Sequence, residues 1–234
     1  MDLSALTESL HAGLIVSCQA LRDEPLFGST HMVAMARAAV QGGAVALRAN
    51  GPEDIAAIRS AIKVPIIGLY KIDFPGCEVR ITPTIEQAVQ VIEAGADIVA
   101  IDATDRPHPG GTAANLIAQI RRRTDRPILA DVATLAEGIA AAAAGAEFVA
   151  TTLSGYTAYS PARMEPDFFL LDQLVKALSP TRTPVIAEGH ITTPAQAFQA
   201  LQLGAHAVVI GSAITRPQWI TAQFVNGLQK GNPP

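Results

Sequence analysis

One lysine of this chain, Lys71, lies where it could carry out proton transfer. It follows the apolar run 65–70, at the point where a buried strand would give way to a loop. An ammonium group that loses its water there has a lowered pKa, and its neutral form can act as a base near pH 7. The alternative is a side chain that lies along apolar surface and keeps its ammonium in water. The rest of the chain has to decide between these two interpretations.

Two carboxylates occupy matching positions on other apolar runs. Counted from the proline that opens each run, Asp131 and Glu188 fall at the fourth position and Lys71 at the sixth. Even offsets share a face of a strand, because successive side chains alternate. One carboxylate could pair with Lys71 and leave the other as an acid/base partner. Carboxylates raise a lysine pKa and burial lowers it, and the sequence leaves open which dominates. A Schiff base between Lys71 and a carbonyl substrate is a competing role.

Further polar residues stand at the ends of other apolar runs. Arg48 offers a planar pair of donors for a carbonyl or hydroxyl oxygen, and the Gln19 amide could bind an acyl group. Counted from a Gly-Ala pair before each run, Asp102 and Thr152 fall at the same position. The polar loop 154–161, which carries Tyr156, is either a lid that excludes water or a longer surface connection.

Two glycine-containing turns near the end of the chain predict a phosphate site. Gly189 follows the seventh apolar run, while Gly211 and Ser212 follow the eighth. Glycines let backbone N–H groups approach a phosphate, and a following helix adds a positive dipole. Arg216, four residues beyond Ser212, could close on the same anion.

Short apolar runs alternate with segments of helical period along the whole chain, and eight strands are expected. The expected strands are 14–17, 44–47, 66–70, 98–101, 128–131, 148–152, 185–187 and 207–210. Helices are expected to begin at capping or proline signals near residues 52, 84, 134 and 193. Eight strands with helices between them predict a single (β/α)₈ TIM barrel over residues 1–230, followed by a frayed tail at 231–234. Strand C-termini then bring the polar residues named above to one rim.

A repeat supports this architecture. Four expected strands are preceded by Gly-Ala, at residues 43, 95, 145 and 204, and three begin after proline, at residues 65, 127 and 184. A left-handed glycine ends a helix, and proline is tolerated at the start of a strand. Because the two signals alternate, the chain repeats a βαβα unit around a ring.

The composition excludes several classes of protein. The 234 residues are 49% hydrophobic and 16% charged, with a formal charge of −4. The one basic run, Arg121 to Arg123, lies at an expected helix end, so nucleic-acid binding is not expected. No segment has the length of a membrane span or the pattern of a signal peptide, which favours a cytoplasmic location. Cys18 and Cys77 indicate neither a disulfide framework nor a metal site.

With these residues assembled, the chain resembles the N-acetylmannosamine-6-phosphate 2-epimerases, phosphate-binding (β/α)₈ barrels of amino-sugar and sialic acid breakdown. The resemblance extends over nearly the whole chain. The matching blocks are Val16-Ser17-Cys18-Gln19, Leu47-Arg48-Ala49-Asn50-Gly51, Leu69-Tyr70-Lys71, Arg80-Ile81-Thr82-Pro83-Thr84, Asp97 to Asp102, Ala130-Asp131-Val132, Thr151 to Thr157, Ala187-Glu188-Gly189 and Gly211 to Pro217.

The resemblance implies inversion at C2 of N-acetylmannosamine 6-phosphate, giving N-acetylglucosamine 6-phosphate without a cofactor. Lys71 matches the lysine that moves the C2 proton, and Glu188 matches its acid/base partner. Asp131 and Arg48 match residues that orient the sugar, and Gln19 matches a substrate contact. His190 is the residue of the phosphate loop whose type is least expected. A homodimer is compatible with the sequence. The alternatives are another sugar-phosphate barrel, such as a Schiff-base aldolase or an indole or thiamine pathway synthase, and a non-catalytic phosphosugar-binding regulator.

Overall fold

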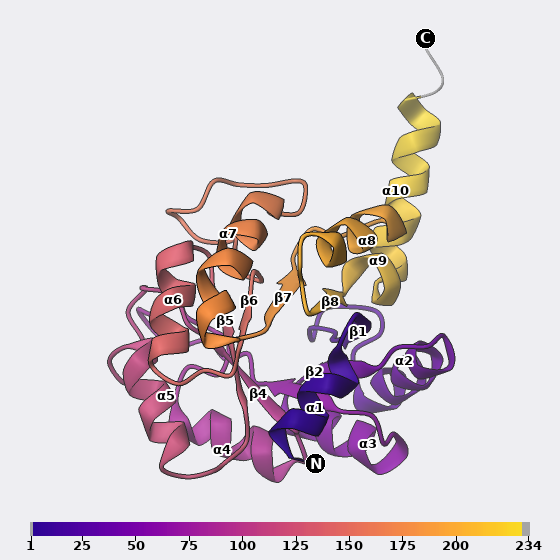
Figure 1. Ribbon diagram of the computed structural model, residues 1–234. Coiled ribbons are helices and arrows are strands. Elements are labelled where there is room, and N and C mark those ends of the chain that lie inside the picture. Colours follow the sequence, from indigo (N-terminus) through magenta and orange to yellow (C-terminus); the bar gives the residue numbers. More distant parts are fainter. Residues whose placement is uncertain (1, 231–234) are drawn as a thin grey trace.

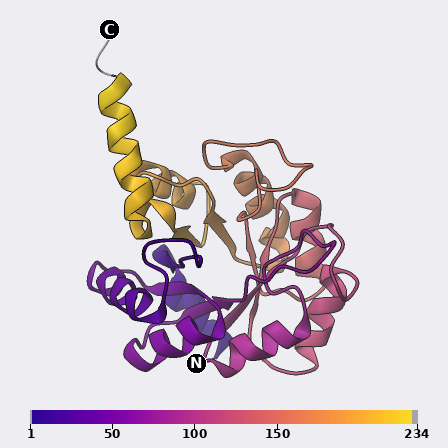
Figure 2. The same cartoon turned by 180° about the vertical axis from the view of Figure 1, so that it is seen from behind.

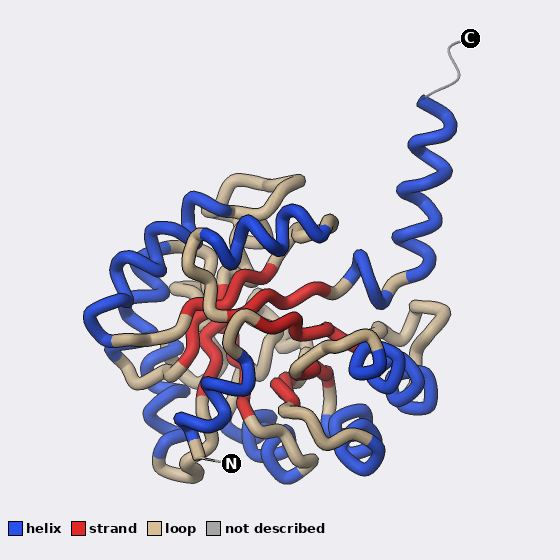
Figure 3. The backbone as a smooth tube through the Cα atoms, turned by 45° about the vertical axis from the view of Figure 1, so that its right-hand side comes forward, coloured by secondary structure: helices blue, strands red, loops and turns tan. Residues whose placement is uncertain are grey.

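The computed structural model, which describes residues 2–230, is a closed barrel of eight parallel strands surrounded by helices (Figures 1 and 3). The predicted tail, 231–234, lies outside the described residues. The strands, each paired with the next and β8 with β1, are β1 (Gly13–Cys18), β2 (Ala46–Asn50), β3 (Ile66–Leu69), β4 (Ile98–Asp102), β5 (Ile128–Asp131), β6 (Phe148–Ala150), β7 (Val185–Glu188) and β8 (Ala207–Ile210). The predicted (β/α)₈ fold is confirmed.

Helices connect the strands around the outside of the barrel. They are α1 (Leu3–Leu10), α2 (Ser29–Gln41), α3 (Pro52–Ala61), α4 (Ile85–Glu93), α5 (Ala113–Arg121), α6 (Leu135–Ala143), α7 (Phe168–Leu178), α8 (Pro194–Gln202), α9 (Ser212–Thr215) and α10 (Pro217–Lys230), with a 3₁₀ turn, η1 (Ser179–Thr181), after α7. The predicted helix starts are confirmed, and Thr134 and Thr193 each form a capping box with the residue three positions later.

The junctions between helices and strands follow the predicted repeat. The four glycines of the Gly-Ala pairs have φ between 94° and 108°, a region that glycine enters without steric cost. Strands β3, β5 and β7 each begin one residue after a proline. These turns lie at the N-terminal ends of the strands, opposite to the rim that collects the polar side chains.

Two apolar clusters form the core. One fills the space between strands and helices, and the other fills the barrel interior with side chains such as Ile67, Leu129 and Phe148. Leu6 and Leu10 of α1 join the interior cluster. This short helix, which the sequence did not lead us to expect, therefore closes the N-terminal end of the barrel.

The strand bounds differ from the predictions most clearly at β2. It was expected at residues 44–47 and lies at 46–50, because Ala44 closes the helix-ending turn by bonding to the Ala39 carbonyl. Strand β6 ends at Ala150, short of the predicted Thr152. As a consequence Arg48 lies within a strand, and Thr152 lies in a loop.

The last helix, α10, extends away from the barrel (Figures 1 and 2). Its side chains Phe224 and Leu228 are 72% and 74% exposed. Among residues 2–230, no helix combines the length and the apolar character needed to cross a membrane.

Candidate active site

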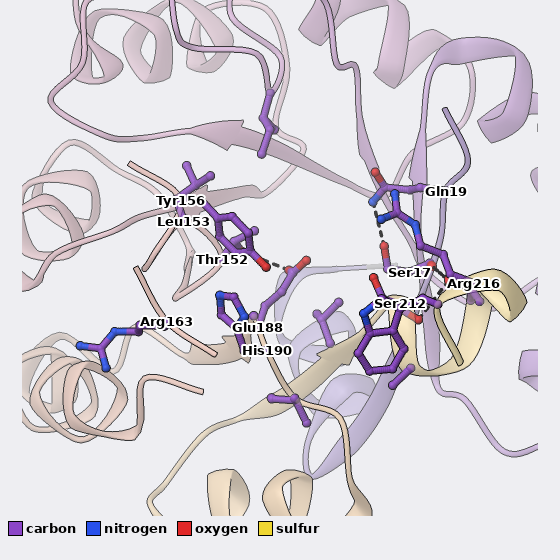
Figure 4. Close-up of a pocket in the computed structure, with 18 of the residues that line it drawn as sticks. Ser17, Gln19, Thr152, Leu153, Tyr156, Arg163, Glu188, His190, Ser212 and Arg216 are labelled. Atoms are coloured by element: carbon purple, nitrogen blue, oxygen red, sulfur yellow. Dashed lines mark hydrogen bonds between the residues drawn. The ribbon is translucent and has the colours of Figure 1, made fainter. Parts of the chain in front are cut away.

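A pocket of about 770 Å³ opens at the C-terminal ends of the strands (Figure 4). Its lining includes ten of the predicted site residues: Gln19, Lys71, Asp102, Thr152, Tyr156, Glu188, Gly189, Gly211, Ser212 and Arg216. Arg48 and Asp131 are not part of the lining, because both are buried below it. The rim that barrel enzymes use for catalysis is thus also the polar rim of this chain.

Lys71 is fixed by its backbone. Its N–H donates to Asn50 Oδ1 at 2.8 Å, and the loop that follows β3 folds back so that Lys71 bridges Ile81. The pKa of Lys71 is lowered to about 8, because burial and the nearby Arg48 guanidinium lower it more than the Glu188 charge raises it. Among the described residues no carboxylate lies within 4.0 Å of its ammonium. Lys71 is half-buried in the pocket wall, which favours a base over the solvated lysine of the alternative interpretation.

Arg48 takes the ion-pair role that the sequence left open for Lys71. Its guanidinium pairs with both Asp131 and Glu188, so strands β2, β5 and β7 are joined across the barrel. The Thr152 hydroxyl lies 2.6 Å from Asp131 Oδ1 and 3.1 Å from Glu188 Oε2. Arg48 is 1% exposed and Asp131 is fully buried. Arg48 therefore holds Glu188 from beneath the pocket, and Asp131 in turn holds Arg48.

Glu188 has an environment suited to proton transfer. Burial raises its pKa above the usual carboxylate range, and the nearby Asp131 charge adds to this, while Arg48 opposes it. Its side chain lines the pocket near Thr152 and His190 (Figure 4). A base with a lowered pKa and an acid with a raised one thus line the same pocket, which is typical of an acid–base site.

Asp102 and Gln19 also line the pocket, but their bonding differs. Both Asp102 oxygens are occupied, one by the backbone and hydroxyl of Thr104 and the other by Arg106 at 2.6 Å. Gln19 Nε2 donates to Ser17 Oγ at 2.8 Å, and its Oε1 is buried without a partner. Because a buried polar atom without a partner is costly, Gln19 has bonding capacity left for a ligand.

Ser212 and Arg216 lie near one another in the pocket wall (Figure 4), and Gly189 and Gly211 also line the pocket. Gly211 precedes α9, Ser212 begins it and Arg216 follows it, while Gly189 has φ of 108°. The Arg216 guanidinium pairs with Glu24, from the loop after β1, at 3.0 Å. Glu24 therefore holds the arginine at the pocket.

The loop after β6 contributes Tyr156 to the pocket and is anchored farther along. Tyr159 Oη donates to Glu137 Oε1 at 2.5 Å. Tyr156 remains 58% exposed, and its ring stacks on His190.

Sequence reasoning missed several residues that line the pocket. Ser17 lies two residues before Gln19, so the alternation of side chains along β1 could have indicated it. Trp219 and Gln223 are spaced four apart on α10, and that helical spacing was the available signal. Arg80, Arg106 and Arg163 come from loops and gave no periodic signal. Within residues 2–230, no group of three His, Cys, Asp or Glu side chains is placed to hold a metal ion.

These features define the chain as a (β/α)₈ barrel whose C-terminal rim holds a pocket lined by a lysine with a lowered pKa and a glutamate with a raised one. Comparison with known proteins gives its family. A family model described as "Putative N-acetylmannosamine-6-phosphate epimerase" matches residues 32–230. The chain is 48% identical to a protein of Caldanaerobacter subterraneus subsp. tengcongensis and 45% identical to one of Shouchella clausii, both named "Putative N-acetylmannosamine-6-phosphate 2-epimerase". These matches cover 96% and 97% of this chain, and 94% and 100% of the relatives.

Solved structures agree. That of the N-acetylmannosamine-6-phosphate 2-epimerase from Clostridium perfringens is similar with a TM-score of 0.90 and 44% identity, over 94% of this chain and 95% of that one. A thiamine phosphate pyrophosphorylase from Pyrococcus furiosus, 17% identical with a TM-score of 0.61, covers 93% of each chain and shares the fold. The chain belongs to the N-acetylmannosamine-6-phosphate epimerase family, an enzyme family, and the resemblance seen in the sequence is confirmed.

Proposed function

We propose that the protein inverts C2 of N-acetylmannosamine 6-phosphate to give N-acetylglucosamine 6-phosphate. The observation that carries this proposal is Lys71, a lysine with a lowered pKa that lines the same pocket as Glu188. A decrease from 10.5 to about 8 raises the neutral fraction of the amine at pH 7 by about 300-fold. The family membership supplies the substrate class.

The chemistry follows from the open-chain form of the sugar. The C2–H bond lies next to the aldehyde, so the carbanion left by its deprotonation is stabilised as an enolate. Neutral Lys71 accepts the C2 proton and becomes an ammonium, and a proton returns to the opposite face of C2. Glu188, whose pKa is raised by burial, is the acid/base partner. The reaction uses only groups of the protein, and we propose that it needs no cofactor.

Binding is divided between the two sides of the pocket. The phosphate is bound by backbone N–H groups at Gly189 and Gly211, by Ser212 and by Arg216. Gln19, Asp102, Thr152 and Tyr156 contact the sugar around the reacting carbon. Arg48 and Asp131 act from below, by fixing the position and charge of Glu188.

The test is proton NMR of N-acetylmannosamine 6-phosphate in D₂O with the wild type and with Lys71→Ala. The wild type should form the epimer with deuterium at C2, and the substitution should abolish both. Exchange that survives in Lys71→Ala would show that another group is the base. Borohydride trapping is a second check, because a covalent adduct at Lys71 would indicate a Schiff-base enzyme. Tight binding without exchange would indicate a regulator.

A further inference from the structure

Two aromatic rings that the proton transfer does not use stand in the wall of the pocket. Tyr156 comes from the loop after β6, and His190 from the turn after β7. Their ring centroids are 4.7 Å apart, and the ring planes differ by 8°. Leu153, which also lines the pocket, precedes Tyr156 in the same loop.

The turn holds His190 in an unusual backbone conformation. Its φ is 57°, a left-handed value that few residues other than glycine adopt, although histidine is among those enriched there. In the described chain no hydrogen bond holds the imidazole, and its Nε2 is buried without a partner. The stack on Tyr156 is therefore one contact that positions the ring.

The stacked pair forms an uncharged surface near neutral pH. Burial lowers the pKa of His190, and the Arg163 guanidinium lowers it further, so the imidazole is neutral. Burial raises the pKa of Tyr156, and the Glu188 charge adds to this, so the phenol keeps its proton. Two neutral rings face an apolar substituent better than they face a phosphate.

The position of the pair relates it to the reacting carbon. In Figure 4, Leu153, Tyr156 and His190 lie on one side of Glu188, and Ser212 and Arg216 lie on the other. A sugar whose phosphate binds beside Ser212 and whose C2 lies at Glu188 directs one substituent toward the rings. The acylamino group is bonded to C2 itself, so it is the substituent that reaches them.

We propose that the Tyr156–His190 pair, with Leu153, forms the subsite for the N-acyl group and limits the length of the acyl chain. This inference rests on the proposed function, because that function places C2 beside Glu188. His190 is then a specificity-determining residue. Gln19, the other candidate for binding the acyl group, lies on the Arg216 side of the pocket (Figure 4).

The test compares mannosamine 6-phosphates with N-acetyl, N-propanoyl and N-butanoyl groups. His190→Asn removes the ring with a residue that tolerates positive φ, and Tyr156→Phe keeps the stacked ring as the matched control. The quantity measured is the ratio of kcat/KM for the N-butanoyl substrate to that for the N-acetyl substrate. His190→Asn should raise this ratio by about tenfold, the usual size of discrimination by one or two methylenes. Tyr156→Phe should leave it within about twofold of the wild type.

Two outcomes would overturn the subsite. In the first, His190→Asn lowers kcat/KM equally for all three acyl chains, which would make the ring merely structural. In the second, Gln19→Ala changes the ratio and His190→Asn does not, which would place the acyl group on the other side.

A binding measurement separates this proposal from the proposed function. Trp219, the one tryptophan of the sequence, lines the pocket, so its fluorescence reports Kd for each sugar phosphate without turnover. If the wild type does not epimerise but His190→Asn still improves N-butanoyl binding relative to N-acetyl binding, the function fails and the subsite stands. If the wild type epimerises the substrate but His190→Asn leaves the ratio of the Kd values unchanged, the function stands and the subsite fails.

Discussion

Replacing Glu188 by glutamine should shift the acidic limb of the pH–rate profile to lower pH, even though it slows the reaction. The Lys71 pKa of about 8 results from burial and Arg48, which lower it, and from Glu188, which raises it. Glu188→Gln removes the carboxylate charge that keeps the ammonium protonated. The neutral, reactive form of Lys71 should therefore appear at lower pH in the variant.

The size of the effect follows from these charges. Removing a nearby opposite charge shifts a pKa by about one unit, the low end of the range for close pairs. At pH 6.5 the neutral fraction of Lys71 would then rise from about 3% to about 24%. Loss of the acid/base partner costs about 10²- to 10⁴-fold in rate. The ratio of the wild-type rate to the variant rate should thus be about seven times smaller at pH 6.5 than at pH 9.

The assay is the rate of C2 deuterium exchange in D₂O, measured by NMR between pD 5.5 and 10 for both proteins. Because both limbs are measured in D₂O, the solvent effect on the pKa cancels. Glu78→Gln is the matched control, because Glu78 is a pocket carboxylate that does not act on the Lys71 pKa. The acidic limb of the Glu78→Gln profile should stay near that of the wild type. A Glu188→Gln limb that stays in place or moves to higher pH would refute the assignment of the limb to Lys71.

Four other predictions concern stability, binding and assembly. Asp131→Ala leaves Arg48 without one of its buried partners, so chemical denaturation should show a loss of about 3–5 kcal/mol. Asp172→Ala, in an exposed pair with Lys176, should cost less than about 1 kcal/mol, and similar losses for both would contradict this reasoning. Gly68→Ala places a Cβ 2.6 Å from side-chain atoms of Val91 and Ala96 and should cost about 1–3 kcal/mol, whereas Gly227→Ala in the open helix α10 should be neutral or stabilising. A thermal or denaturant scan that shows no difference between these two would count against the packing argument. Arg216→Gln should raise KM for the phosphorylated sugar about 10- to 100-fold with little change in kcat and weaken inhibition by inorganic phosphate; an unchanged KM would exclude Arg216 from the phosphate site. We propose that Phe224 and Leu228, exposed on α10, contact a second copy of the chain, so Phe224→Glu with Leu228→Glu should convert a homodimer into a monomer in light scattering, and a monomeric wild type would refute this contact.

The strands and helices could be predicted because their signals are local. A glycine such as Gly145 ends a helix through its own backbone, and Thr134 caps the next one through residues three positions away. The polar rim could be predicted by counting from the glycine or proline that precedes each strand, and Asp102, Asp131 and Glu188 are indeed the last residues of their strands.

The pairing of charges could not be predicted in the same way. Arg48 meets Asp131 and Glu188 only because β2, β5 and β7 face one another across a closed barrel, far apart in the sequence. A charge count allowed Lys71 the role that Arg48 fills. The sequence also does not show how deeply a guanidinium is buried, and this depth places Arg48 beneath the pocket.

The closure of the barrel has a consequence for synthesis on the ribosome. Strand β1 pairs with β8, with Gly13 opposite Ala207. The first strand to be translated therefore cannot complete its hydrogen bonding until the last strand has been made. At 5–20 residues per second, one edge of β1 stays without its partner for roughly 10–40 s. This edge carries apolar side chains such as Ile15 and Val16, and unpaired apolar edges recruit other chains. The nascent chain is therefore expected to need protection by chaperones until residue 210 has left the exit tunnel.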